Sequence, residues 1–293
     1  MELGRLGVWF ATDAMTAPEA AELAQQVESL GYGALWIPET VGRDPMAHSS
    51  WLLANTTDLV VATGIANIHY RDAATAAQCQ LTLAEQSGGR FLLGLGVSHI
   101  PLVEGFRGHD YGKPLTAMRE YLAKMGDALY VAPAPPDDPP TVIAALGPKM
   151  LALAAERCQG AHPYFVTPEH TATAREVLGP ERWLCVEQKV VLETDPAAAR
   201  EVCRRNAGIY LDLPNYRNNW KRLGFEDADF ENGGSDRFID ATFAWGDTDV
   251  IAARVEEHFA AGASHVCIQP FDPETMGRID TRVLEALAPG GGS

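Results

Sequence analysis

Residues 6–37 read LGVWFATDAMTAPEAAELAQQVESLGYGALWI, and this stretch contains a complete strand–helix–strand unit. The apolar runs at 6–10 and 34–38 predict two strands. Between them, Thr16 and Glu19 have the spacing of a capping box, and apolar residues then recur at intervals of three and four, which is typical of an amphipathic helix. Gly31 is placed to end that helix. The unit therefore predicts two parallel strands connected by a helix.

The same alternation continues along the rest of the chain. Apolar runs predict eight strands, at residues 6–10, 34–38, 59–68, 91–97, 141–146, 161–165, 183–192 and 265–269. Amphipathic stretches predict further helices at 46–57, 73–86, 114–130, 148–158, 167–178 and 247–262, with a last helix ending at Leu287. Strands that read as continuous apolar runs are typical of a parallel sheet covered on both faces.

Eight strand–helix units favour an α/β fold, a single (β/α)8 TIM-type barrel spanning residues 1–293. A doubly wound sheet is the alternative, but the glycine-rich turn expected after its first strand is absent, because Phe10 is followed by Ala11-Thr12-Asp13. Residues 196–243, approximately, hold a helix, an aromatic stretch and a glycine-rich turn. We interpret them as a helical and loop insertion before the last βα unit of the same domain.

The composition is that of a globular chain and excludes several classes of function. Lysine and arginine number 23 against 39 aspartate and glutamate, so the net charge of −16 disfavours binding to nucleic acid or to an anionic membrane. No apolar run approaches the roughly 18 residues of a membrane helix, and no secretory leader is evident. Five scattered cysteines predict reduced thiols. We therefore expect a cytoplasmic protein that binds neither nucleic acid nor membrane.

In a barrel of this kind the reaction takes place at the carboxyl ends of the strands. Two adjacent strands carry glycines there, in TGIANI at 63–68 and FLLGLGVSH at 91–99. Glycine within a buried strand indicates a close approach of the backbone or a distortion, and together the two segments predict a flat ring lying against the backbone. The histidines near strand ends have no fixed ligand spacing, so we expect no metal site.

Several stretches resemble the luciferase-like flavin and deazaflavin superfamily, and most closely its coenzyme F420-dependent oxidoreductases. They are GVWF at 7–10, ESLGYGALWIPE at 28–39, VVATGIANI at 60–68, SGGRFLLGLGVSH at 87–99, the stretch at 143–170 and HFAAGASHVCIQ at 258–269. The resemblance covers nearly the whole chain. It implies an enzyme, an oxidoreductase that transfers a hydride between the deazaflavin C5 and a small organic substrate, and it implies a homodimer. An FMN-dependent luciferase-like monooxygenase and a non-catalytic flavin- or deazaflavin-binding protein are the alternatives.

The resemblance also implies roles for particular residues near the ring. In relatives a non-prolyl cis peptide in the third strand lies against the central ring of the cofactor, and the matching bond is Gly64–Ile65. Cofactor contacts are then expected from Gly64, Ile65, Ala66, Asn67 and Ser98. His99 matches the position of a glutamate acid in a related sugar-phosphate dehydrogenase, so we expect it to contact the cofactor and to act in catalysis. Glu39 matches the acidic second-strand position that contacts ring or substrate, and it is the other expected catalytic residue, although some F420 relatives have Asp-His where this chain has Glu39-Thr40.

The phosphate end of the cofactor is expected at residues 144–149, AALGPK, where a strand end, a glycine and a helix start present free backbone N–H groups to an anion. In relatives this loop holds the cofactor phosphate. The expected contacts there are Leu146, Gly147, Pro148, Lys149, His162 and Tyr164. The acidic tail of F420 also needs cations, for which Arg71, Lys149, Arg217, Lys221 and Arg222 are available. The aromatic stretch at 210–220 fits either a lid or an interface between subunits.

Overall fold

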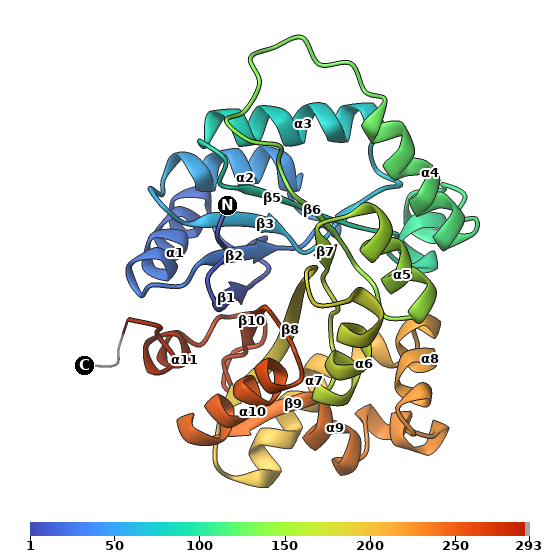
Figure 1. The fold of residues 1–293 in the computed structure, drawn as a ribbon. Coiled ribbons are helices and arrows are strands. Elements are labelled where there is room, and N and C mark those ends of the chain that lie inside the picture. Colours follow the sequence, from blue (N-terminus) through green and yellow to red (C-terminus); the bar gives the residue numbers. More distant parts are fainter. Residues whose placement is uncertain (291–293) are drawn as a thin grey trace.

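The computed structural model describes residues 1–290, and its strands form a closed parallel barrel with helices outside it (Figure 1). The ring contains β1 (Leu6–Trp9), β2 (Ala34–Ile37), β3 (Val60–Thr63) with β4 (Ala66–Asn67), β5 (Phe91–Gly96), β6 (Thr141–Ile143), β7 (Gly160–Ala161), β8 (Trp183–Leu192) and β10 (His265–Pro270). It closes because β10 pairs with both β1 and β8, with Leu6 opposite Val266 and His265 opposite Cys185. The predicted TIM-type barrel is therefore confirmed.

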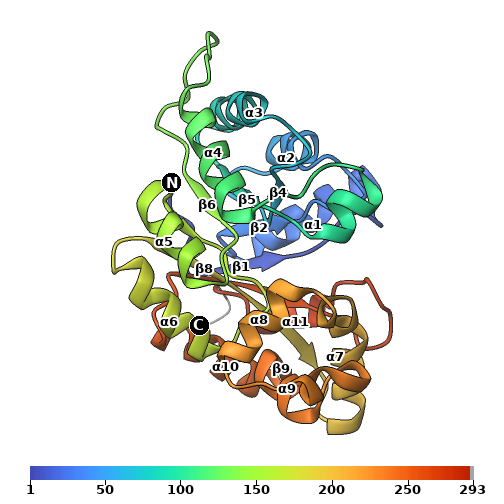
Figure 2. The same cartoon turned by 90° about the vertical axis from the view of Figure 1, so that its right-hand side faces the viewer.

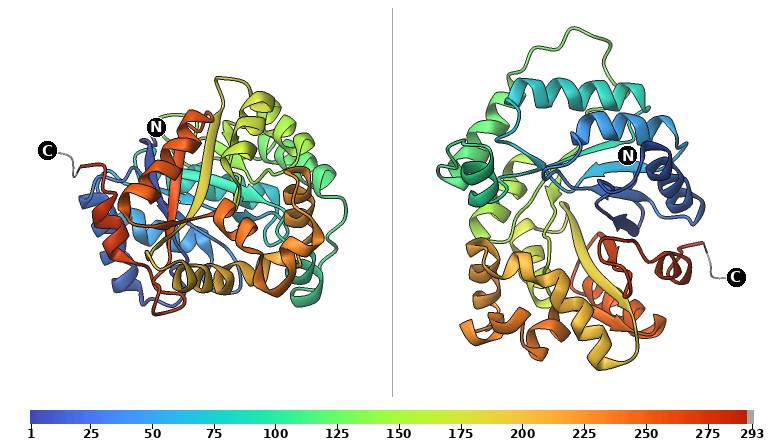
Figure 3. Two further views of the ribbon diagram at one scale, coloured as in Figure 1. Left: turned by 90° about the horizontal axis from the view of Figure 1, so that it is seen from below. Right: turned by 180° about the vertical axis from the view of Figure 1, so that it is seen from behind.

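The helices lie around the ring and follow the strands in turn (Figures 1 and 3). They are α1 (Ala17–Ser29), α2 (Pro45–Ala54), α3 (Ala73–Gln86), α4 (Pro114–Gly126), α5 (Pro148–Arg157), α6 (Pro168–Leu178), α7 (Pro196–Leu211), α8 (Pro214–Arg222), α9 (Asp236–Thr242), α10 (Thr248–Ala260) and α11 (Thr281–Ala286), with a π-helical turn at Pro101–Phe106 and a 3-10 segment at Asp227–Gly233. The predicted capping box is present: Thr16 accepts from the Glu19 N–H, and Glu19 accepts from the Thr16 N–H.

Two of the predicted strands differ from those in the structure. The run at 59–68 is interrupted after Thr63, and the two pieces flank a cis peptide bond between Gly64 and Ile65, the bond that the family resemblance implies. The run at 161–165 forms only the short strand β7, which ends at Ala161, and the chain turns at Phe165, which has a positive φ of 59°. Both departures lie at the carboxyl end of the barrel.

The segment between β8 and β10 contains more structure than the sequence predicts. Helices α7, α8 and α9 gather on one side of the molecule (Figure 2), and β9 (Phe243–Gly246), which the sequence analysis missed, pairs in parallel with the second half of β8. Since β7 pairs only with the start of β8, the edge of β8 from Lys189 onward is free to accept β9.

Apolar side chains form three buried layers. The largest lies between the helices and the outer face of the barrel. A second fills the barrel interior and includes Trp9 and Trp36. The third is an aromatic cluster in which α7–α9 pack on Phe165 and Phe243. No helix of the described residues is long and apolar enough to cross a membrane.

Candidate functional site

Buried polar atoms without a partner concentrate at the carboxyl end of the barrel. Within residues 1–290, eight buried side-chain nitrogen or oxygen atoms make no hydrogen bond, and one of them, Ser49 Oγ, lies on α2 outside the ring of strands. The other seven belong to Asn67, His69, Tyr70, His99, His162, His170 and Asn219. Because native proteins satisfy almost all buried polar groups, such a concentration indicates a place where a ligand or ordered water completes the hydrogen bonding.

The break in the third strand forms one wall of this site. Gly64 donates to the Ile37 carbonyl at 2.8 Å, and its own carbonyl accepts from the indole N–H of Trp9 at 2.9 Å. A Cβ on Gly64 would stand 2.6 Å from Trp9 Nε1 and 3.2 Å from His162 Nε2. Only glycine fits there, and the unpartnered Nε2 of His162 faces the backbone that the sequence analysis assigned to the cofactor ring.

The glycines of β5 have a different role from the one expected. Gly94 and Gly96 were expected to leave space for a flat ring. In the structure a Cβ on Gly94 would stand 1.9 Å from the Thr63 carbonyl oxygen, and one on Gly96 would stand 2.3 Å from Ile65 Cδ1. That face of β5 is therefore filled by the third strand itself. The glycines make room for the interruption in the strand, and the expectation that they face a ligand is wrong.

Glu39 is fixed by its neighbours. Its carboxylate accepts from the Asn67 N–H at 2.6 Å and from both terminal nitrogens of Arg71, which also pairs with Asp44. Burial alone would lower the pKa of Arg71, but its hydrogen bonds to Glu39 outweigh burial and raise it. Asn67 is fully buried; its side-chain oxygen accepts from the His69 N–H, and its Nδ2 is unpartnered. Glu39 thus holds in place the backbone of Asn67, whose unpartnered Nδ2 is a free donor at the mouth.

His99 lies at the end of β5, half-buried, with its ring centroid 5.7 Å from that of Tyr216 on α8. Its Nδ1 makes no hydrogen bond. Burial lowers the pKa of His99, and a hydrogen bond with Asn215 only partly opposes this, so the site favours the neutral imidazole. The preceding residue, Ser98, has a positive φ of 56°, and its carbonyl accepts from Tyr111.

The predicted phosphate loop lies beside α8. Gly147 caps α5 without any side-chain hydrogen bond, and a Cβ on it would stand 3.6 Å from Arg222 Nη2. Arg222 donates to the Asn219 side-chain oxygen at 3.1 Å, and the buried Nδ2 of Asn219 is left without a partner. His170 Nε2 lies 2.9 Å from the carbonyl of Leu146. Of the other loop residues, Pro148 and Lys149 are exposed.

The other cations suggested for an acidic tail are less available than the sequence indicates. Arg217 and Lys221 both pair with Asp227, and Arg71 is held by Glu39 and Asp44. Arg222, by contrast, has an amide oxygen as its hydrogen-bond partner. Ion pairing within the chain, which sequence spacing does not reveal, accounts for this difference.

A polar network in the upper barrel interior joins the strand-end residues Glu187 and Gln269 to Lys189, which the sequence did not single out. Lys189 of β8 is completely buried, 3.1 Å from both carboxylate oxygens of Glu187 and 3.2 Å from Gln269 Oε1. Tyr164, predicted to contact the cofactor, donates to the same Gln269 oxygen. Burial lowers the pKa of Lys189 to about 8 despite the nearby Glu187, and burial raises the pKa of Glu187. Three consecutive polar residues, Glu187-Gln188-Lys189, in an otherwise apolar strand were the available signal.

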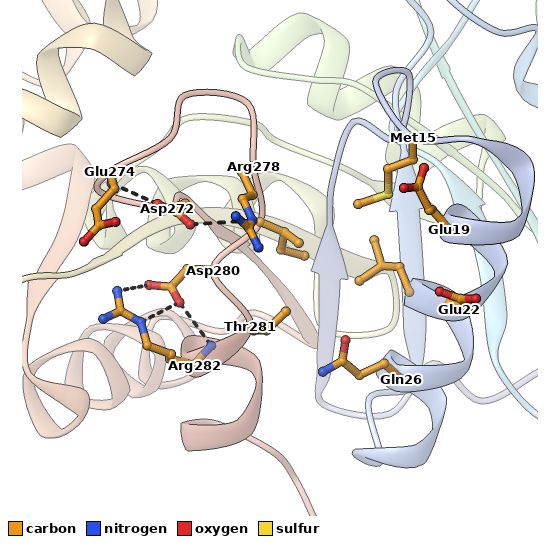
Figure 4. A pocket seen from close by; sticks show the side chains of 12 residues that line it. Met15, Glu19, Glu22, Gln26, Asp272, Glu274, Arg278, Asp280, Thr281 and Arg282 are labelled. Atoms are coloured by element: carbon orange, nitrogen blue, oxygen red, sulfur yellow. Dashed lines mark hydrogen bonds and ion pairs between the residues drawn. The ribbon is translucent and has the colours of Figure 1, made fainter.

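Two open grooves are also present, and His69 and Arg71 of the site described above line the second of them. One of about 520 Å³ runs between α1 and the loop after β10, where Asp272 pairs with Arg278 and Asp280 with Arg282 opposite the acidic face of α1 (Figure 4). The other, of about 550 Å³, lies between the loop after β4 and the start of α4. Within residues 1–290, no group of three or more His, Cys, Asp or Glu side chains is placed to hold a metal ion.

A closed parallel barrel with an interrupted third strand and unpartnered buried polar atoms around its mouth is typical of a barrel enzyme with a ligand site at the carboxyl end of its strands. Comparison with known sequences then identifies the family. The sequence model of luciferase-like monooxygenases matches residues 2–265, and the chain belongs to this family of oxidoreductases.

Individual relatives agree with this assignment. A Mycobacterium tuberculosis protein named as a coenzyme F420-dependent oxidoreductase is 30% identical over 72% of this chain and 72% of its own length. Among solved structures, the coenzyme F420-dependent tetrahydromethanopterin reductase of Methanopyrus kandleri superposes with a TM-score of 0.78 at 20% identity, covering 99% of this chain and 98% of that one. The oxygenating constituent of a Pseudomonas putida diketocamphane monooxygenase, solved with FMN, gives 0.71 at 15% identity over 97% and 96%. These two structures share the fold.

Proposed function

We propose that the protein is a coenzyme F420-dependent oxidoreductase that transfers a hydride between the deazaflavin C5 and a small organic substrate. The observation that carries this proposal is the row of unpartnered buried nitrogens at the mouth, which extends from Asn67 and His162 beside Gly64 to Asn219 beside the start of α5. Similarity to the Mycobacterium tuberculosis protein supports F420 as the cofactor.

The residues present fit both ends of such a cofactor. At the ring end, the Gly64–Asn67 backbone forms a wall, and Asn67 Nδ2 and His162 Nε2 lack partners that ring carbonyl and N–H groups would supply. At the phosphate end, the backbone N–H of Lys149 in the first turn of α5, the guanidinium of Arg222 and Asn219 Nδ2 are three donors suited to an anion, whereas Pro148 has no N–H and that of Met150 already bonds to the Gly147 carbonyl. When bound, F420 supplies the hydride donor or acceptor.

The side chains of the protein have two roles in this reaction: one accepts or returns a proton, and others hold the wall of the site in position. His99 Nδ1 is unpartnered, and its neutral imidazole can accept the proton that a substrate releases as it loses hydride, or return it in the reverse direction. We assign Glu39 to positioning: it holds the Asn67 backbone and Arg71, so its carboxylate orients the wall. Replacing His99 with alanine should leave F420 affinity nearly unchanged and reduce F420 turnover by about 100-fold. A non-catalytic carrier would show no turnover in the wild-type protein.

The cofactor assignment is tested by titrating apo-protein with F420 and FMN in parallel, followed by fluorescence quenching. We expect F420 to bind more tightly, and Asn219→Ala to weaken F420 binding about tenfold by removing a buried donor. Ser49→Ala is the matched control, since it also removes a buried unpartnered polar atom but lies on α2, outside the ring of strands. Binding of FMN alone would replace this proposal with an FMN-dependent monooxygenase, the second candidate, which the family's description favours.

A further inference from the structure

The buried pair Lys189–Glu187 lies at the start of a hydrogen-bond chain that the proposed chemistry does not use. Both side chains are fully buried within the barrel. The ammonium also lies over the rings of Tyr164, at 3.6 Å from its centroid, and Phe165, at 4.3 Å. From Gln269, the chain continues to the Tyr164 hydroxyl at 2.9 Å and then to the Tyr210 hydroxyl at 2.8 Å.

The charge on Lys189 fixes the direction of every bond in this chain. An ammonium has only donors, so Gln269 must turn its oxygen toward Lys189. Tyr164 bonds to that same oxygen and must therefore donate its single hydroxyl proton to it. The Tyr164 oxygen is left as an acceptor, so Tyr210 in turn donates to Tyr164. As a result, the Tyr210 hydroxyl has only lone pairs left to offer to another molecule.

The chain ends in the region where ring and substrate are expected. The Tyr164 ring lies 5.1 Å from that of Trp9, which holds the Gly64 carbonyl. The Tyr210 ring lies 5.2 Å from that of Tyr216, which is in turn the neighbour of His99. Tyr164 and Tyr210 are only partly buried, in contrast to the fully enclosed ion pair. The two tyrosines thus lie between the Gly64 wall and the proposed proton acceptor.

We propose that Lys189, held by Glu187, is a positioning residue that makes Tyr210 a pure hydrogen-bond acceptor, and that the site thereby selects substrates carrying a hydroxyl or amine N–H at this point. This proposal rests on the proposed function for the location of the substrate. A contribution to stability does not explain the buried Lys189–Glu187 pair well. Desolvation of two charges commonly offsets their attraction, and two apolar residues of similar volume often give equal stability.

The test compares two probes of nearly equal size, cyclohexanol and fluorocyclohexane, of which only the first has a hydrogen-bond donor, and their affinities are measured by saturation-transfer NMR with and without added F420. Wild-type protein should bind cyclohexanol about fivefold more tightly, the effect of one neutral hydrogen bond. Tyr210→Phe should make the two affinities equal. The double variant Lys189→Met/Glu187→Gln, which leaves no unpaired buried charge, should also lose the preference. Tyr130→Phe, which removes a hydroxyl outside the mouth, should retain it.

Each outcome decides the question. Equal affinities in the wild-type protein, or an unchanged preference in Tyr210→Phe, would overturn the proposal. A preference lost in Tyr210→Phe but kept in the double variant would overturn the role of Lys189. If the double variant does not fold, Gln269→Leu removes the shared oxygen without touching the ion pair and must abolish the preference. The probe ratio requires no cofactor, so a failed F420 titration and a failed probe comparison are distinguishable.

Discussion

Replacing Gly94 with alanine should destabilise the protein far more than a methyl group in a strand ordinarily does. The added Cβ would lie 1.9 Å from the Thr63 carbonyl oxygen, where contacts below 3.0 Å are essentially never observed, so two buried backbones must separate by about 1 Å. The same movement would break two hydrogen bonds, from the Thr63 hydroxyl to the Gly94 carbonyl at 2.7 Å and from the Gly94 N–H to the Thr63 hydroxyl at 2.9 Å.

The cost follows from these contacts. Overpacking a core costs about 1–3 kcal/mol, and each lost hydrogen bond about 1 kcal/mol, so we expect Gly94→Ala to lower the free energy of unfolding by about 3–5 kcal/mol. Urea denaturation measures this, and F420 titration should show weakened binding because the Gly64 wall moves with Thr63. Gly208→Ala is the matched control: it lies in α7 with nothing near its added Cβ and should stabilise the protein by about 0.5–1 kcal/mol. A Gly94→Ala variant within 1 kcal/mol of wild type, with unchanged F420 affinity, would refute the assigned role of this glycine.

Three further predictions concern buried polar groups. Trp9→Phe removes the donor to the buried Gly64 carbonyl and should cost about 1–3 kcal/mol in denaturant unfolding, whereas Trp51→Phe, whose indole N–H bonds an exposed carbonyl, should cost less than 1 kcal/mol; equal costs would contradict this assignment. Burial lowers the pKa values of three histidines, to about 4, about 3 and about 4 for His162, His258 and His265. Because the unfolded chain takes up these protons near pH 6.5 and the folded protein does not, the three histidines should leave stability unaffected above pH 7 and should lower it by about 4 kcal/mol per pH unit below pH 6. An unfolding midpoint unchanged between pH 7 and pH 5 would exclude this prediction. Glu39→Gln should weaken F420 binding several-fold by loosening Asn67, while Glu28→Gln, at a carboxylate that accepts backbone N–H groups in the loop before β3, should lower stability without affecting binding; loss of binding in both variants would show that the effect is not local.

The sequence by itself determined the barrel. Continuous apolar runs and helical periodicity predicted strands and helices that the structure contains, including β8 at its observed limits and the Thr16–Glu19 capping box. It also placed the break in the third strand at the correct glycine through family resemblance. These features depend on residues a few positions apart, since backbone conformation and side-chain alternation are local properties.

Only the tertiary structure decided what each polar or small residue faces. Gly94 and Gly96 were expected to face a ring and face the third strand instead, and Lys189 finds its partner Gln269 eighty positions away. Asn219 and Arg222 reach the start of α5 because α7–α9 pack on the aromatic cluster, and β9 forms because β8 is longer than its neighbour β7. A buried polar atom lacks a hydrogen-bond partner only if no distant segment supplies one. The unpartnered atoms of the site are therefore decided when the barrel closes.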